Sequence, residues 1–146
     1  MKLRKFILIA LLALFSFGDL VYAQDSMTMQ VVSERVREKK KNNTWSNWSG
    51  WVSSNAIVYY GLDDDGDLAF YYEDEENSEN DLYFVITYMS DPKYDNEGGE
   101  HATARITEIH SGTRGTLEWY TYPSGTSNLF TLKFSEIELQ WRTRDL

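Results

Sequence analysis

The chain has 146 residues, a formal net charge of −9 at pH 7 and no cysteine. The lack of cysteine excludes disulfides and thiol catalysis, so stability must come from burial of aliphatic and aromatic side chains. An acidic protein is repelled by phosphate backbones and by anionic lipid surfaces. We therefore expect no nucleic-acid partner.

Residues 1–23 have the three-part layout of a secretory signal peptide. Lys2, Arg4 and Lys5 form a positive head, a nearly unbroken apolar run covers Phe6–Phe17, and Val21-Tyr22-Ala23 places small residues at the two positions that a signal peptidase reads. The apolar run is shorter than the roughly 20 residues of a membrane span, so cleavage is expected and an uncleaved anchor is the alternative. We expect an exported protein, periplasmic or extracellular, with one domain over 24–146 and no stable membrane span after cleavage.

The first segment of that domain, 27–41, fits two structures. Val32 and Val36 lie four residues apart, as on a helix, whereas Met29 and Val31 alternate as in a strand. We favour the strand because the rest of the sequence has β character, and because a long first strand could close the sheet.

Further strands are predicted from β-branched and aromatic enrichment and from period-two alternation. Leu82–Met89 is apolar on both faces and is predicted to be a central strand. In Ala102–Ile109 the apolar side chains change face at Ile109, which suggests a β-bulge. The strands predicted after the first segment cover 56–60, 68–72, 82–89, 102–109, 117–122, 130–134 and 137–141.

Turn chemistry separates these strands. Asp-Gly, Gly-Gly and Pro-Ser-Gly sequences lie between them, and the polar runs Lys39–Asn43 and Ser135-Glu136 add further turns. Short strands at even spacing predict a single antiparallel all-β meander of about seven to nine strands. We expect a barrel, and a β-sandwich is the alternative.

Trp45, Trp48 and Trp51 form the pattern Trp-Ser-Asn-Trp-Ser-Gly-Trp. In a regular strand a spacing of three would put successive rings on opposite faces, whereas in a turn or bulge all three could converge. The first interpretation makes them packing residues. The second makes them a ligand-binding platform, because exposed aromatic rings stack on sugars and on cationic groups of a partner.

Asp63, Asp65 and Asp67 are a candidate calcium site. The EF-hand loop is excluded because it needs glycine at its sixth position, and Gly66 falls at the fourth position counted from Asp63. A looser calcium site at a hairpin tip is one interpretation, and an ordinary acidic turn is the other. We expect no cofactor, with calcium as the alternative.

Catalytic signatures are sparse. His101 and His110 are the two histidines, and either could serve a hydrolase as a general base beside a carboxylate. The sequence has neither the Gly-x-Ser-x-Gly motif of a nucleophile elbow nor the His-Glu-x-x-His motif of a metalloprotease. We expect no enzyme and assign no catalytic residue.

The end of the leader, Val21-Tyr22-Ala23 before Gln24, resembles the leaders of exported Bacteroidota proteins. Behind it, the early Trp45-x-x-Trp48 and the closing alternation Leu129–Trp141 are similar to those of small uncharacterised secreted all-β proteins of that group. The resemblance implies an exported β domain, and it implies no activity, substrate or site.

Together these observations predict a non-enzymatic exported binding module that meets a glycan or a protein through its surface aromatics. The first alternative is a carrier of a small apolar ligand, because an antiparallel barrel can hold one in its mouth. The carrier would have a cavity lined by Phe84, Ile86, Phe130 or Trp141. The second alternative is the hydrolase that uses a histidine.

Overall fold

The structure is a computed structural model and describes residues 27–146. The predicted signal peptide, 1–23, lies outside the described residues. Within them the chain is all-β apart from a 3-10 turn at Ser78–Asn80. The strands are β1 (Met27–Glu38), β2 (Val52–Ser53), β3 (Ile57–Leu62), β4 (Leu68–Glu73), β5 (Leu82–Met89), β6 (Lys93–Tyr94), β7 (Glu100–Glu108), β8 (Arg114–Thr121), β9 (Ser127–Lys133) and β10 (Ile137–Asp145).

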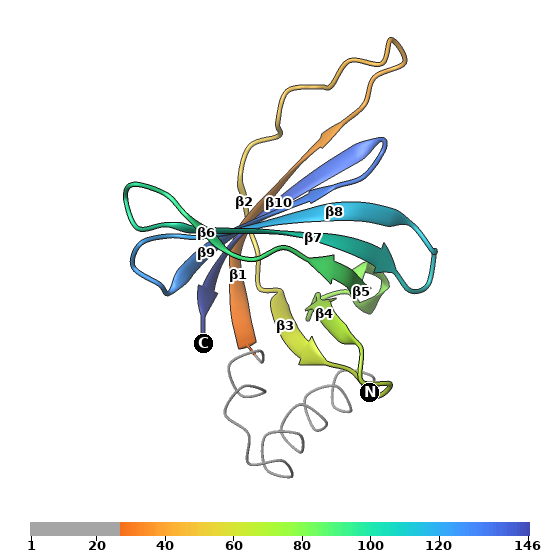
Figure 1. The fold of residues 1–146 in the computed structure, drawn as a ribbon. Coiled ribbons are helices and arrows are strands. Elements are labelled where there is room, and N and C mark those ends of the chain that lie inside the picture. The colour runs from red at the N-terminus through yellow and green to blue at the C-terminus, as the bar shows by residue number, and fades with distance from the viewer. Residues whose placement is uncertain (1–26) are drawn as a thin grey trace.

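The longer strands form a closed antiparallel barrel (Figure 1). The strand order is β10-β9-β8-β7-β5-β4-β3-β1, and β1 pairs with β10 to close the circle. The two short strands add to its margin, β2 against β1 and β6 against β7. The predicted antiparallel barrel is confirmed, and the sandwich alternative is wrong.

Closure depends on the length of β1. Its pairing with β10 runs from Met29 opposite Asp145 to Glu38 opposite Ile137, while its first residues also pair with β3. The prediction of a strand in this segment, long enough to close the sheet, is confirmed. Closure satisfies the backbone groups that would otherwise form two open edges.

The barrel has two different ends. At the terminal end the Leu146 amide donates to the Thr28 carbonyl at 3.0 Å, so the beginning and the end of the described chain lie side by side. At the opposite end, β1 continues past the start of β3, and the chain then turns and returns through β2. We call residues 34–53 the tryptophan arm, and it projects from the barrel in Figure 1. We call this opposite end the arm end.

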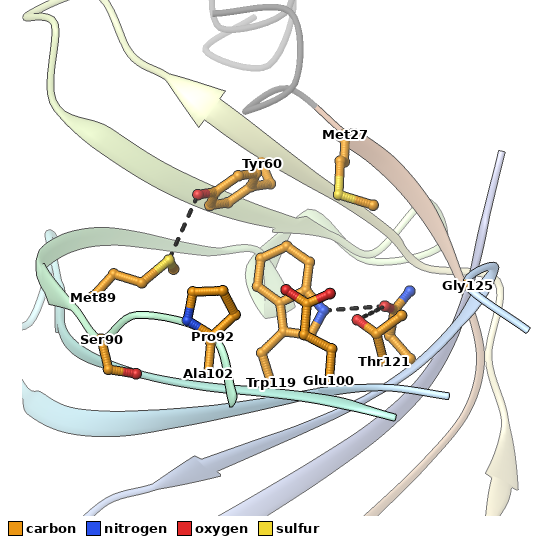
Figure 2. A pocket seen from close by; sticks show the side chains of 11 residues that line it. Met27, Tyr60, Met89, Ser90, Pro92, Glu100, Ala102, Trp119, Thr121 and Gly125 are labelled. Carbon is orange, nitrogen blue, oxygen red and sulfur yellow. Dashed lines mark hydrogen bonds between the residues drawn. The ribbon is translucent and has the colours of Figure 1, made fainter. Parts of the chain in front are cut away.

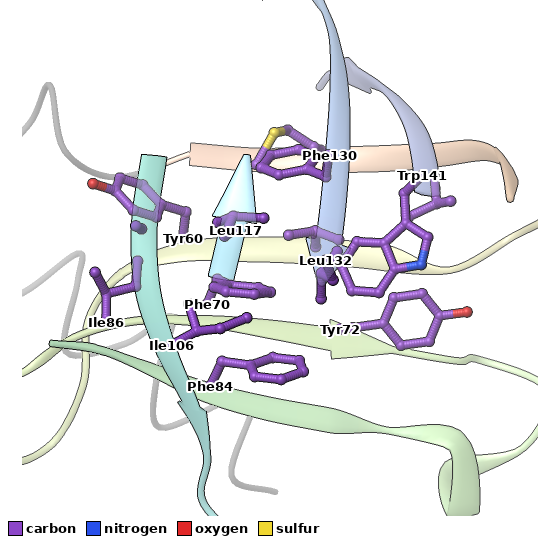
Figure 3. Close-up of a cluster of buried hydrophobic side chains, with 14 of the residues drawn as sticks. Tyr60, Phe70, Tyr72, Phe84, Ile86, Ile106, Leu117, Phe130, Leu132 and Trp141 are labelled. Carbon is purple, nitrogen blue, oxygen red and sulfur yellow. The ribbon is translucent and has the colours of Figure 1, made fainter. Parts of the chain in front are cut away.

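Aromatic side chains fill the barrel interior (Figure 3). Phe70 stacks on Phe84 with ring centroids 4.7 Å apart, and Tyr72 stacks on Trp141 at the same distance. Phe70 also meets Trp141 edge to face at 6.3 Å. Each of the four is at most 5 % exposed. These contacts join strands β4, β5 and β10 across the interior, which is the core expected of a cysteine-free domain.

One detail differs from the sequence-based expectations. The predicted bulge near Ile109 is wrong: the register shift lies in the neighbouring strand, between Ile86 and Tyr88 of β5, and Ile109 follows the end of β7. Glu138 of β10 is a charged residue, yet it is only 5 % exposed. The arm covers it, because Arg37 reaches across from β1 and binds its carboxylate.

Candidate functional site

The tryptophans of the arm alternate with cations in a single row along the outside of β1. Each ring is half-buried and lies between two positive groups, within the distance at which cation–π attraction acts. The row is Arg142, Trp51, Arg35, Trp48, Arg37, Trp45 and Lys39, with successive cation-to-centroid distances of 3.8, 4.5, 4.8, 4.8, 5.1 and 5.7 Å.

Serines set this geometry. The Ser49 amide donates to the Val36 carbonyl at 2.8 Å, and the Ser49 hydroxyl accepts the Val36 amide at 3.0 Å. Ser46 binds Glu38 in the same two-way manner. The segment 45–53 runs back along β1, and each step of three residues in it matches a step of two residues in β1. Strand β2 continues this relation, with Val52 opposite Glu34. In a regular strand, tryptophans three residues apart would point to opposite faces. Here the three-to-two pairing brings all three rings to the same side of β1.

Strand β10 holds the guanidinium groups from the other side. Arg35 donates from Nε to the Gln140 side-chain oxygen at 2.7 Å. Arg37 donates from Nε to Glu138 Oε1 at 2.7 Å, and its Nη2 binds the same oxygen. The faces of the Trp48 ring are thus occupied by fixed groups of the chain itself, so stacking on a sugar or base would require displacing an arginine.

A large cavity lies at the arm end, between the β4–β5, β7–β8 and β9–β10 turns. Its volume is about 810 Å³. Its apolar wall consists of Leu82, Phe84, Phe134, Ile137 and Leu139. Ligand pockets for small molecules measure roughly 300–1,000 Å³ and combine such a wall with a few polar groups.

The charged groups that line this cavity are acidic apart from one histidine. Glu79, Asp81, Glu108 and Glu136 are the acids, and His110 is the histidine. The lining includes no lysine or arginine among the described residues. The local potential therefore disfavours an anionic head group in the mouth.

Two of these acids also stabilise the turns around the opening. Glu108 Oε2 accepts the amides of His110 and Ser111 at 3.0 and 2.7 Å and the Ser111 hydroxyl at 2.8 Å. Burial alone would raise the pKa of Glu108, but these donors outweigh it and hold the pKa below its usual range. Asp81 accepts the Tyr71 hydroxyl at 2.9 Å, and burial together with this bond raises the pKa of Tyr71.

A second, smaller cavity of about 420 Å³ lies at the terminal end (Figure 2). Its apolar lining includes Met27, Met89 and Trp119. Its polar groups bond to one another: Asn128 Oδ1 accepts Trp119 Nε1 at 3.1 Å and the Thr121 hydroxyl at 2.9 Å. Glu100 and Ser90 also line this cavity.

The three aspartates of the candidate calcium site lie together at the β3–β4 turn, with carboxylate oxygens within 4.8 Å of one another. Asp63 is already engaged by the fold. Its Oδ1 accepts the amides of Asp65 and Asp67 at 3.0 and 2.8 Å, and its Oδ2 accepts the Tyr83 hydroxyl at 2.8 Å. Gly66, with φ of +80°, completes the turn. The arrangement is what an acidic hairpin tip requires, and the calcium interpretation stays a prediction.

The two histidines lie at opposite ends of β7, so they do not share a site. At the terminal end, His101 Nε2 is 3.8 Å from Asp95 Oδ2. That carboxylate accepts the Gly99 amide at 2.8 Å and the Tyr120 hydroxyl at 3.0 Å, and these bonds lower the pKa of Asp95 despite some desolvation. His110 belongs to the cavity rim at the arm end.

Sequence reasoning found the tryptophans but missed their partners. Arg35, Arg37 and Lys39 recur every second residue on one face of β1, and this alternation beside a three-residue tryptophan repeat was the available signal. Of the residues expected to line a ligand cavity, Phe84 lines the arm-end cavity of about 810 Å³. Trp141 lines another cavity, of about 400 Å³, beside Glu34 and Tyr72. Ile86 and Phe130 belong to the packed core instead.

Comparisons with protein-family models, curated proteins and solved structures found no match. Within residues 27–146, no helix has the length and apolar character needed to cross a membrane.

Proposed function

We propose that the protein binds a small apolar or amphipathic molecule, neutral or cationic, in the cavity at the arm end. The observation that carries this proposal is the combination of an apolar wall with an acidic rim in about 810 Å³. Closed antiparallel barrels of this size can hold one small ligand in the mouth. The packed aromatic layer below Phe84 limits the ligand to the mouth and excludes it from the barrel centre.

The rim determines which head group fits. A carboxylate or sulfate would approach Glu79, Asp81 and Glu136 without a lysine or arginine among the described lining residues to receive it. A hydroxyl, amide or ammonium group would find acceptors there. Ordinary fatty acids are therefore not among the ligands that we propose, because their carboxylate would meet this acidic rim.

A competition experiment tests both parts of the proposal. The neutral dye N-phenyl-1-naphthylamine is bound to the purified protein and displaced by dodecanol, dodecylamine or dodecanoate below their micellar concentrations. We expect dodecanol and dodecylamine to displace the dye at about tenfold lower concentration than dodecanoate, since one unfavourable charge contact of about 1.4 kcal/mol corresponds to a factor of ten. Dodecanol is the decisive competitor because it cannot bind by charge alone.

Two cavity-filling variants locate the site. Ile137→Trp adds bulk to the arm-end cavity and should abolish dye binding, whereas Ala102→Trp adds bulk to the terminal-end cavity and should leave it intact. Circular dichroism would verify that both variants fold. Absence of dye binding, or its loss in Ala102→Trp alone, would overturn the proposal.

A further inference from the structure

Positive charge is concentrated on the tryptophan arm of an otherwise acidic protein. Arg35, Arg37, Lys39, Lys40 and Lys41 fall within seven residues, whereas 42–92 contain acidic residues and no lysine or arginine. Arg142 of β10 joins the same row beside Trp51. The arm is therefore the part of the described chain to which a polyanion would be attracted.

Several of these cations have no acidic partner. Within residues 27–146, Arg37 pairs with Glu138, while Arg35, Arg142 and the three lysines form no ion pair. Arg142 and the lysines are exposed. Their donors are thus available to an external anion.

The row is also held in place before any partner arrives. Each guanidinium rests against one or two indole rings, and Ser46 and Ser49 fasten the returning segment to β1. Cations on alternate residues of a strand are separated by about 6.6 Å. A linear array of fixed charges suits an extended polymer with regularly repeated anions better than a small ligand.

We propose that the tryptophan arm binds a linear anionic polysaccharide carrying carboxylate or sulfate groups. Single-stranded nucleic acid is disfavoured because it needs free aromatic faces for base stacking, and here each of the three tryptophan rings already has two cations against it. A lipid surface is disfavoured because the tip, Lys39–Thr44, has no apolar side chain to insert. This proposal is independent of the arm-end cavity.

The test measures binding of the purified protein by isothermal titration calorimetry at low salt. The probes are heparin for sulfate, polygalacturonate for carboxylate, dextran as a neutral chain, duplex DNA and anionic phosphatidylglycerol vesicles. We expect heparin or polygalacturonate to bind, with affinity falling as salt rises. Dextran should not bind, and DNA and vesicles should bind at least tenfold more weakly than the better polysaccharide.

A matched pair of triple variants separates the arm from net charge. Lys39→Gln, Lys40→Gln and Lys41→Gln together should weaken polysaccharide binding about tenfold, because surface charge pairs contribute about 0.2–1 kcal/mol each. Lys93→Gln, Arg105→Gln and Arg114→Gln remove the same charge from exposed positions away from the arm and should change binding less than twofold. Circular dichroism would confirm folding.

Four results would overturn the proposal. The first two are no binding of either acidic polysaccharide, and an equal loss of polysaccharide affinity in the two triple variants. The third is tighter binding of DNA or vesicles than of the polysaccharides. The fourth is salt-sensitive self-association, in which the arm binds the acidic surface of a second copy. Failure here leaves the dye-displacement result at the cavity unaffected, because the triple variants change no cavity-lining residue.

Discussion

Tryptophan lies on both faces of this barrel, and the two settings differ in what surrounds the ring. Inside, Trp141 is 3 % exposed and packs on Tyr72 and Phe70. Outside, Trp48 is half-buried between Arg35 and Arg37. Burial of apolar area stabilises the first, and cation–π attraction with side-chain hydrogen bonds stabilises the second. The inner aromatics thus form the core of the fold, whereas the outer ones keep a row of cations in position.

Replacement of the inner tryptophan should have the largest effect. Trp141→Ala removes a buried side chain that packs against Phe70, Tyr72 and Phe130, so we expect the free energy of unfolding to fall by about 3–5 kcal/mol. Urea denaturation at pH 7 measures the loss. Trp141→Phe, which keeps an aromatic ring, should lose less than half as much, and a loss below about 1 kcal/mol in Trp141→Ala would contradict the assignment of this residue to the core.

Replacement of the outer tryptophan should lower the free energy of unfolding by a smaller amount. Trp48→Ala removes two cation–π contacts at a half-exposed site, each of about 0.5–1 kcal/mol, so we expect the free energy of unfolding to fall by about 1–2 kcal/mol. The same denaturation experiment compares it with Trp141→Ala. An equal loss in the two variants would mean that the arm belongs to the cooperative core and that the contrast between the two faces is wrong.

Alkaline pH should weaken the inner aromatic cluster. The Tyr72 hydroxyl donates to Glu34 Oε2 at 2.8 Å. Burial first, and then this bond and the charge of Glu34, raise the pKa of Tyr72 above its usual value. The folded state therefore favours the protonated phenol, and its contribution is present below the unfolded pKa of about 10 and is lost as pH rises above it.

Tyr72→Phe measures that contribution. Between pH 8 and pH 11 the wild type should lose about 1.4 kcal/mol more stability than Tyr72→Phe, because one pH unit above the unfolded pKa corresponds to that amount. Urea denaturation at the two pH values provides the comparison. Tyr94→Phe, at a tyrosine that is 70 % exposed and outside the cluster, serves as the control. Identical pH dependence in Tyr72→Phe and the wild type would refute the coupling.

The contrast between the faces also explains which features could be predicted from the sequence. The inner face follows the period of two that any strand imposes, so the alternation of Leu139 and Trp141 and the position of the closing strands could be predicted. In the outer row the tryptophans recur every three residues and the cations of β1 every two residues, and the two segments lie side by side across the turn of the arm. Their register depends on Ser46 and Ser49 meeting β1, which is a tertiary contact that local spacing does not encode. The cavity was missed in part for a similar reason, since three separate turns assemble its rim.

The smallest effect should come from the serines that fasten the arm. Ser49→Ala removes the acceptor of the Val36 amide, and Ser46→Ala removes the acceptor of the Glu38 amide. Because water can replace either bond at this exposed edge, we expect each change to cost only about 0.5–1 kcal/mol. Hydrogen exchange resolves the two: Ser49→Ala should speed exchange at Val36, and Ser46→Ala at Glu38, with each variant sparing the other amide. If both variants leave both amides equally protected, the serine bonds do not set the three-to-two register, and the spacing of the tryptophan motif needs another cause.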